Sequence, residues 1–170
     1  MITLIIGIHN SGKSLVAEKL ASLTEDGYRL YLATMKVMDE EGKKRVQKHR
    51  KQRRGKGFVT VEKTMNIAEV LGEIKEPQNT TILLECVSNL AGNEMHDNPC
   101  GVKSADTLAG EIKLLSDGVH NMIIVTNEYD LEEGYDSDTK RYVEFLHEIN
   151  DRIISFADRV IDLRQKTNMT

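Results

Sequence analysis

The sequence predicts an α/β domain with a mostly parallel sheet that is covered by helices on both faces. Strand-like apolar runs alternate with helix-like segments along the chain, which is the order typical of such sheets. Several of these runs are almost continuously apolar, as parallel strands buried on both faces are. The 170 residues are the size of one compact domain, and no Gly/Ser/Pro-rich stretch suggests a linker, so residues 1–170 are expected to form a single domain.

The first elements are predicted to be two strands with a helix between them. Residues 2–6 (ITLII) form a short apolar run, rich in β-branched residues, that ends at Gly7 as a buried strand would. Residues 14–23 carry apolar side chains at the spacing of one helix face. Residues 28–34 (YRLYLAT) follow Gly27 and are predicted to be the second strand.

The next three elements are predicted to be a helix, a strand and a second helix. Residues 38–53 have acidic side chains in the first turn and basic ones toward the end, which complements the helix dipole. Residues 58–62 (FVTVE) alternate between apolar and polar as a strand does. Residues 66–74 are predicted to be helical, with Asn66 as the N-cap.

The second half of the chain is predicted to contain three further strands and two helices. The polar and glycine-containing residues 88–104 are predicted to be an irregular loop. The strands are expected at 80–86 (TTILLEC), 122–128 (MIIVTNE) and 159–163 (RVIDL), and the helices at about 105–117 and 138–157.

Positive charge is concentrated in one segment. The chain has 23 basic and 27 acidic residues, and nine of the bases lie in residues 43–56 (KKRVQKHRKQRRGK). Without those nine, 14 bases face 27 acids, so the rest of the chain carries a charge of −13. A general nucleic-acid binder would carry a broader basic surface. We therefore expect a small polyphosphate ligand and no nucleic-acid partner.

The protein is expected to be cytoplasmic. The opening MITLIIGI is too short for a signal peptide or a membrane span, and no other segment approaches membrane-spanning length. Cys86 and Cys100 do not form a disulfide framework and are most simply reduced thiols.

A phosphate-binding loop is predicted between the first strand and the first helix. GIHNSGKS fits the pattern G-x-x-x-x-G-K-[ST] in the structural context that this pattern needs. The backbone amides and the helix N-terminus would surround nucleotide phosphates, Lys13 would neutralise the outer ones, and Ser14 would bind Mg²⁺. The loop consists of Gly7, Ile8, His9, Asn10, Ser11, Gly12, Lys13 and Ser14.

Carboxylates and other polar groups near strand ends are candidate partners of this loop. Glu85 ends the apolar run 82–84 and could be the second magnesium ligand, or a surface glutamate at a strand end. Asn127 and Glu128 follow another strand and are expected to face the cleft at the carboxyl edge of the sheet. His9 could contact phosphate or merely fill the loop.

The segment EMHDNPC contains three residues of metal-ligand type, His96, Asp97 and Cys100. No second cluster completes a standard metal site, so no metal is predicted there.

His49 lies in the middle of the basic segment. On a helix it shares a face with Arg45, Gln52 and Arg53. Neighbouring cations favour a neutral imidazole, whose lone pair can attack phosphorus, while the arginines could hold a triphosphate. From composition alone, however, a solvated basic face with an incidental histidine is the favoured interpretation.

Segments in order along nearly the whole chain resemble one enzyme family. They are GIHNSGKS, YLAT, MDEEGKKRVQKHRKQRR, TVE, ILLEC, VTNE and INDRIISFADRVIDL, of which the histidine-containing helix is the most specific. The family is that of the bifunctional adenosylcobinamide kinase / adenosylcobinamide-phosphate guanylyltransferase of cobalamin biosynthesis.

The resemblance implies a RecA-like P-loop fold, a homotrimer, and GTP, ATP and Mg²⁺ as ligands. It implies that adenosylcobinamide is phosphorylated and that GMP then passes from GTP through His49 to adenosylcobinamide phosphate, giving adenosyl-GDP-cobinamide. His49, Lys13 and Glu85 are the expected catalytic residues. Besides Gly7 to Ser14, the implied nucleotide-binding residues are Leu32, Ala33, Thr34, Arg50, Lys51, Gln52, Arg53, Glu62 and Glu85.

The chain departs from the family pattern in three places. Ile8, His9 and Asn10 replace Gly-Ala-Arg, Gly55 replaces a proline, and YDLEEGYDSDT replaces a glycine-rich stretch after VTNE. A paralogue that retains one of the two activities, a P-loop kinase for another small metabolite, and a non-enzymatic nucleotide- or nucleic-acid-binding module are the alternatives.

Overall fold

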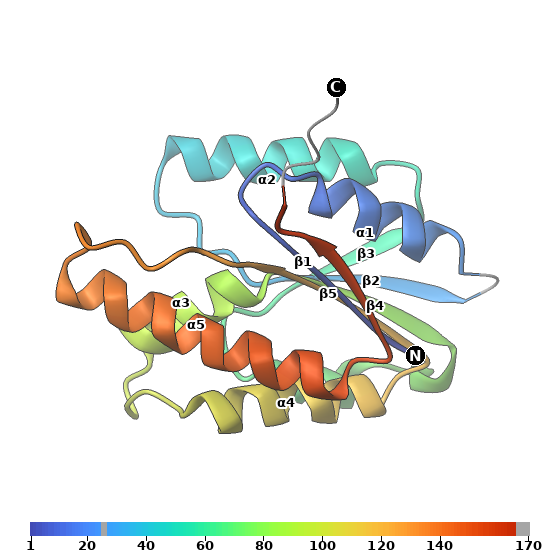
Figure 1. Ribbon diagram of the computed structural model, residues 1–170. Coiled ribbons are helices and arrows are strands. Elements are labelled where there is room, and N and C mark those ends of the chain that lie inside the picture. The colour runs from blue at the N-terminus through green and yellow to red at the C-terminus, as the bar shows by residue number, and fades with distance from the viewer. Residues whose placement is uncertain (25–26, 166–170) are drawn as a thin grey trace.

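A computed structural model describes residues 1–24 and 27–165. Its strands form one sheet in the order β3-β2-β4-β5-β1-β6, with every neighbouring pair parallel. The predicted parallel sheet with helices on both faces is confirmed (Figure 1). The strands are β1 (Ile2–Gly7), β2 (Tyr28–Ala33), β3 (Phe58–Glu62), β4 (Thr80–Glu85), β5 (Asn121–Asn127) and β6 (Arg159–Leu163).

The helices divide between the two faces. In Figure 1, α1 (Lys13–Ser22) and α2 (Glu40–Arg53) lie above the sheet, and three helices lie below it. The lower helices are α3 (Val87–Asp97), α4 (Ala105–Asp117) and α5 (Ser137–Phe156). Two short 3₁₀ helices, η1 (Ile67–Glu73) and η2 (Pro77–Asn79), precede β4.

Each face of the sheet has its own apolar core. The larger core packs side chains of α3, α4, α5 and η1 against one face, and the smaller packs α1 against the other. The central strands β1, β4 and β5 are buried on both faces, which explains their continuous apolar sequences. The edge strands β3 and β6 are only partly buried.

The prediction of an irregular loop at 88–104 is wrong for most of that segment, because α3 occupies Val87–Asp97. Val87, Leu90 and Ala91 form an apolar stripe at helical spacing, and all three are fully buried. Asn93 and Glu94 interrupt that stripe in the sequence, yet both are buried. Their amide and carboxylate find hydrogen-bond partners on neighbouring segments, so a sequence that reads as polar folds as a core helix.

The helix predicted at 66–74 is a 3₁₀ helix. Its two buried residues, Ile67 and Val70, are three positions apart, the repeat of a 3₁₀ turn. Asn66 occupies the predicted N-cap position with a left-handed φ of 54°, but its side chain makes no capping hydrogen bond and accepts one from Lys103 instead.

The first and last strands meet at the start of the phosphate loop. β1 pairs with β6, and the register places Gly7 beside Leu163. A Cβ on Gly7 would lie 2.5 Å from the Ser11 hydroxyl and 3.0 Å from the Cβ of Leu163. Glycine is thus required here by close packing.

Across residues 1–24 and 27–165, no helix combines the length and the apolar character needed to cross a membrane. Cys86 is buried and Cys100 exposed, and both are free thiols.

Candidate active site

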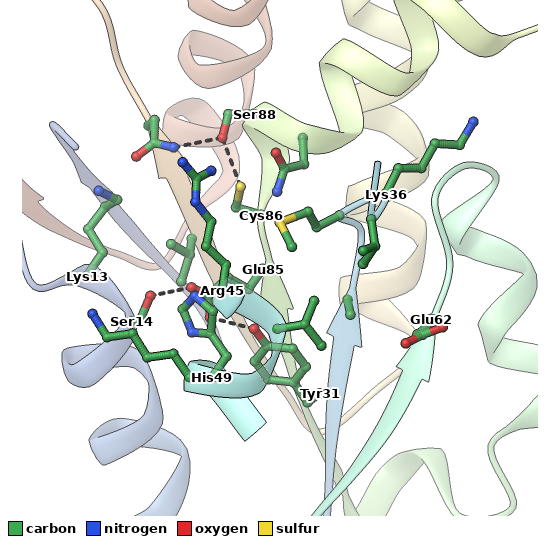
Figure 2. A pocket seen from close by; sticks show the side chains of 18 of the residues that line it. Lys13, Ser14, Tyr31, Lys36, Arg45, His49, Glu62, Glu85, Cys86 and Ser88 are labelled. Atoms are coloured by element: carbon green, nitrogen blue, oxygen red, sulfur yellow. Dashed lines mark hydrogen bonds between the residues drawn. The ribbon is translucent and has the colours of Figure 1, made fainter. Parts of the chain in front are cut away.

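A cavity of about 1460 Å³ lies at the carboxyl ends of the central strands. Its lining includes residues His9–Ser14 of the loop after β1, the ends of β2, β4 and β5, and one face of α2. Figure 2 shows Lys13 and Ser14 on one side and His49 close by, with Glu85 and Cys86 at the end of β4. The phosphate loop and the basic helix, far apart in the sequence, therefore share one cavity.

The phosphate loop has the backbone that its motif requires. Gly12 has a left-handed φ of 85° and leads directly into α1, which starts at Lys13. The Lys13 ammonium donates to the carbonyl of Ile8 at 2.5 Å and to the hydroxyl of Ser11 at 3.3 Å. Burial lowers the pKa of Lys13, and this effect outweighs the electrostatic influence of Cys86 and Glu85, which would raise that pKa. An anionic phosphate would compensate this desolvated cation.

The Glu85 carboxylate binds two hydroxyl groups of the cavity. One of its carboxylate oxygens accepts a hydrogen bond from Ser14, and the other accepts one from the Tyr31 hydroxyl at 3.1 Å. Burial, and then the charge of Glu85, raise the pKa of Tyr31, so this hydroxyl stays protonated and remains a donor.

The groups around Glu85 fit a magnesium ion. A hydroxyl and one carboxylate beside a phosphate loop are a donor set that Mg²⁺ uses, with the remaining positions filled by phosphate oxygens and water. Within residues 1–24 and 27–165, no cluster of three or more His, Cys, Asp or Glu could hold a metal by itself.

Helix α2 brings the basic residues to the cavity. The Asp39 side chain caps it by accepting from the amide of Gly42 at 2.7 Å, so the predicted helix is present with the predicted charge order. His49 is half-buried, and its Nδ1 has no hydrogen-bond partner in the described chain. The α2 residues that line the cavity are Arg45, Val46, Lys48, His49, Arg50, Gln52 and Arg53.

Two arginines of α2 make specific contacts with the sheet. Arg50 lies 3.5 Å from Glu62, which also lines the cavity. Arg53 is 7% exposed, and its guanidinium carbon lies 3.4 Å from the centre of the Tyr31 ring.

Other residues of the predicted site lie outside the cavity lining. Leu32 is fully buried in the larger core. The buried Thr34 hydroxyl donates to the carbonyl of Cys86 and accepts from its amide, both at 2.8 Å. Ala33, between them, does line the cavity. Gly7, Ile8 and Lys51 also lie outside the lining of this cavity.

Asn127 and Glu128 point in different directions. Asn127 lines the cavity as expected, whereas Glu128 forms an ion pair with Arg164 at 2.5 Å outside it. The residues of metal-ligand type are also engaged elsewhere. Asp97 pairs with Lys36 at 3.1 Å, and His96 lies 3.9 Å from Asp138.

The cavity contains groups that sequence analysis did not single out. The Tyr142 hydroxyl donates to the carbonyl of Ser88 at 3.0 Å, and the Ser88 hydroxyl accepts from Asn127 at 2.9 Å. The same hydroxyl lies 2.9 Å from the Cys86 thiol, whose pKa is raised by burial. Ser88 belongs to α3. Because the sequence predicts a loop there, it does not place Ser88 at the carboxyl edge of the sheet.

Comparison with known proteins identifies a family that matches nearly the whole chain. Residues 3–165 match the family described as cobinamide kinase / cobinamide phosphate guanyltransferase. The Bifunctional adenosylcobalamin biosynthesis protein CobU of Escherichia coli (strain K12) is 35% identical over 97 residues, which are 57% of this chain and 51% of that protein. The matched part therefore spans about half the length of this curated relative.

Among solved structures, the flagellar accessory protein FlaH from Methanocaldococcus jannaschii has a similar fold. The TM-score is 0.54 at 16% identity, over 95% of this chain and 70% of that chain. At this identity the likeness concerns the fold alone. Together with a parallel sheet that carries a phosphate loop after β1, it confirms the predicted P-loop architecture. By the match over residues 3–165, the chain belongs to the cobinamide kinase / cobinamide phosphate guanyltransferase family.

Proposed function

We propose that this protein is a kinase and guanylyltransferase of cobalamin biosynthesis that uses His49 as the nucleophile for nucleotidyl transfer. The observation that carries the proposal is the single cavity in which the phosphate loop and His49 meet. A triphosphate held by Lys13 and Ser14 would lie beside the His49 imidazole, whose buried Nδ1 has no hydrogen-bond partner among the described residues. Family membership supports both activities.

In the guanylyl step, the His49 imidazole attacks the α-phosphorus of GTP. A nitrogen–phosphorus bond forms, the bond from the α-phosphorus to the bridging oxygen breaks, and pyrophosphate leaves with that electron pair. An oxygen of adenosylcobinamide phosphate then attacks the same phosphorus, and breaking the nitrogen–phosphorus bond regenerates the imidazole. Arg45 and Arg50, which line the cavity, hold the charge of the triphosphate and of the departing pyrophosphate.

In the kinase step, the aminopropanol hydroxyl of adenosylcobinamide attacks the γ-phosphorus of ATP or GTP and releases its proton to water. The bond from the γ-phosphorus to the bridging oxygen breaks, and the nucleoside diphosphate leaves with that electron pair. Lys13 holds the outer phosphates, while Ser14 and Glu85 would hold the magnesium ion. When bound, that ion neutralises developing charge on the phosphate oxygens. A homotrimer, which rests on the family resemblance, and a cytoplasmic location, which rests on the sequence analysis, complete the proposal.

A partial-function paralogue is the second candidate. It is favoured by the segment after β5, where the acidic residues 130–136 form a largely exposed loop in place of a glycine-rich stretch. In that case the protein would retain the guanylyl step or the kinase step alone, and its acceptor could be another small metabolite.

The test is to incubate the protein with GTP labelled at the α-phosphate and to look for an acid-labile, base-stable adduct. The expected result is an adduct on wild-type protein that is absent in His49→Ala. His120→Ala is the matched control, because His120 is exposed and outside the cavity lining. An adduct that persists in His49→Ala would refute the assignment of the nucleophile. Complete absence of an adduct from wild-type protein would leave the kinase alternative.

The kinase step is tested with label at the γ-phosphate and adenosylcobinamide as acceptor. Transfer should survive His49→Ala and be lost in Lys13→Ala. If no label reaches the corrinoid while the GMP adduct still forms, the protein is a guanylyltransferase alone.

A further inference from the structure

Helix α2 is attached to the rest of the molecule in an unusual way. The structure describes all 14 of its residues, and among them Arg53 alone is buried. The remaining positions are mostly charged and at least partly exposed, so α2 has no apolar stripe that could hold it against the sheet. Its position depends on a small number of polar contacts.

The main contact is a stack of Arg53 on Tyr31. The guanidinium carbon lies 3.4 Å from the ring centre, and Tyr31 itself is only 5% exposed. Arg53 Nη2 also lies 3.4 Å from the Thr60 hydroxyl on β3. A guanidinium placed over the face of a buried aromatic ring is attracted to it by a cation–π interaction.

Tyr31 extends this contact to the phosphate site. Its hydroxyl donates to Glu85, the carboxylate that also accepts from Ser14 at the start of α1. A continuous series of contacts therefore runs from Ser14 through Glu85 and Tyr31 to Arg53. Arg53 follows His49 by four residues in α2, about one helical turn, so the series ends one turn from the nucleophile.

We propose that Arg53 and Tyr31 are positioning residues. They hold α2, and with it His49, in a fixed position relative to the Glu85 carboxylate. The proposal deepens the function given above and rests on it for the role of His49. Without the stack, α2 would still be tethered at its ends, because Lys56 pairs with the buried Glu18 at 3.1 Å and the backbone continues from Asp39. The helix could then tilt, and His49 would lose its alignment with the α-phosphorus. Loss of alignment by about 1 Å can slow a reaction roughly 100-fold.

A competing role for Arg53 is direct contact with the nucleotide phosphates, which the family resemblance implies. Its Nη1 is buried and has no hydrogen-bond partner among the residues described, so this role is open to it. The two roles differ in what a substitution changes. Loss of a phosphate contact weakens GTP binding, whereas loss of positioning slows guanylylation at saturating GTP and loosens α2 even when no nucleotide is added.

The first experiment measures amide hydrogen exchange across residues 40–53 without nucleotide. Arg53→Met and Tyr31→Leu should each speed exchange in α2 by about tenfold or more and leave β4 and β5 unchanged. Lys44→Met is the matched control, since Lys44 is exposed on the same helix and outside the main cavity. Exchange in α2 that is unaltered in both variants, or equally altered in the control, would overturn the positioning role.

The second experiment separates rate from affinity. At saturating GTP, Arg53→Met and Tyr31→Leu should form the GMP adduct about 10–100 times more slowly, with the GTP dissociation constant within about twofold of wild type. Tyr31→Phe retains the ring and should keep more of the adduct rate than Tyr31→Leu. A dissociation constant that rises in proportion to the loss of rate would assign Arg53 to nucleotide binding and refute the proposal. If wild-type protein forms no adduct, the proposed function fails, while the exchange experiment still decides how α2 is held.

Discussion

Replacing Lys56 with methionine should destabilise the protein by about 2–3 kcal/mol. Lys56 follows α2, and its ammonium lies 3.1 Å from Glu18, whose side chain is completely buried in α1. The other oxygen of Glu18 has no hydrogen-bond partner within the described residues, so Lys56 supplies most of the compensation for that buried charge.

The magnitude follows from the burial of the two partners. Removing one member of a fully buried ion pair costs about 3–5 kcal/mol, because the other charge stays buried without compensation. The Lys56 side chain is 38% exposed, so water already shares its charge and the lower figure of about 2–3 kcal/mol is expected. For a chain of this length, that corresponds to a fall of roughly 5–10 °C in Tm.

Urea unfolding followed by circular dichroism measures this effect. Lys43→Met is the matched control: Lys43 pairs with Glu40 at a similar 3.0 Å, but both side chains are exposed, so a change below about 0.5 kcal/mol is expected. The double variant Glu18→Met with Lys56→Met should recover most of the lost stability, because no buried charge remains. A loss below about 0.5 kcal/mol in Lys56→Met, or a double variant no more stable than the single one, would refute the reasoning.

Three further predictions concern the site and the fold. Ser14→Ala and Glu85→Gln should each raise the Mg²⁺ concentration needed for half-maximal GMP transfer, as a magnesium titration of the rate would show; an unchanged titration would contradict the metal site. Lys13→Met should make the nucleotide-free protein more stable at pH 7, because the folded-state pKa of Lys13 lies below 10.5 and the charged form is disfavoured. The free energy of unfolding of wild-type protein should therefore rise with pH from that lowered pKa toward 10.5, and the variant should lack this rise. Added GTP should stabilise wild-type protein only. Urea unfolding at a series of pH values measures both effects. Gly110→Ala in α4 should raise stability by about 0.5–1 kcal/mol, because a Cβ there meets no atom within 4 Å, whereas Gly118→Ala would place a Cβ 2.5 Å from a leucine methyl and should not stabilise.

The order of strands and helices could be predicted because most elements have simple sequence patterns. The central strands are buried on both faces, and their apolar runs are bounded by glycine or polar residues. The phosphate loop was predictable for a different reason: its glycine and lysine are needed at fixed spacing by the backbone geometry, which Gly12 adopts. The capping of α2 by Asp39 follows from local sequence as well.

The remainder of the site depends on contacts between distant segments, which composition does not encode. Arg53 lies in a run of charged residues and reads as exposed, yet it is buried because the ring of Tyr31 lies beneath it. Tyr31 could be assigned to a strand, but its contact with Glu85 depends on the pairing of β2 with β4. Ser88 was missed because the buried polar residues of α3 interrupt its helical pattern.

The close packing of Gly7 against Leu163 ties the start of the phosphate loop to a part of the chain that is made late. The first residue of the phosphate loop emerges from the ribosome early, but its neighbouring strand β6 is synthesised more than 150 residues later, as the separation of 156 residues between the bonded Ile2 and Asp158 illustrates. Contacts of such long range form late in folding. A nascent chain that lacks β6 leaves β1 at the edge of the sheet, with one side of Gly7 uncovered. Gly7 therefore acquires its neighbour Leu163 only after the last strand has been synthesised, so the final packing of the first residue of the phosphate loop is a late event of chain synthesis.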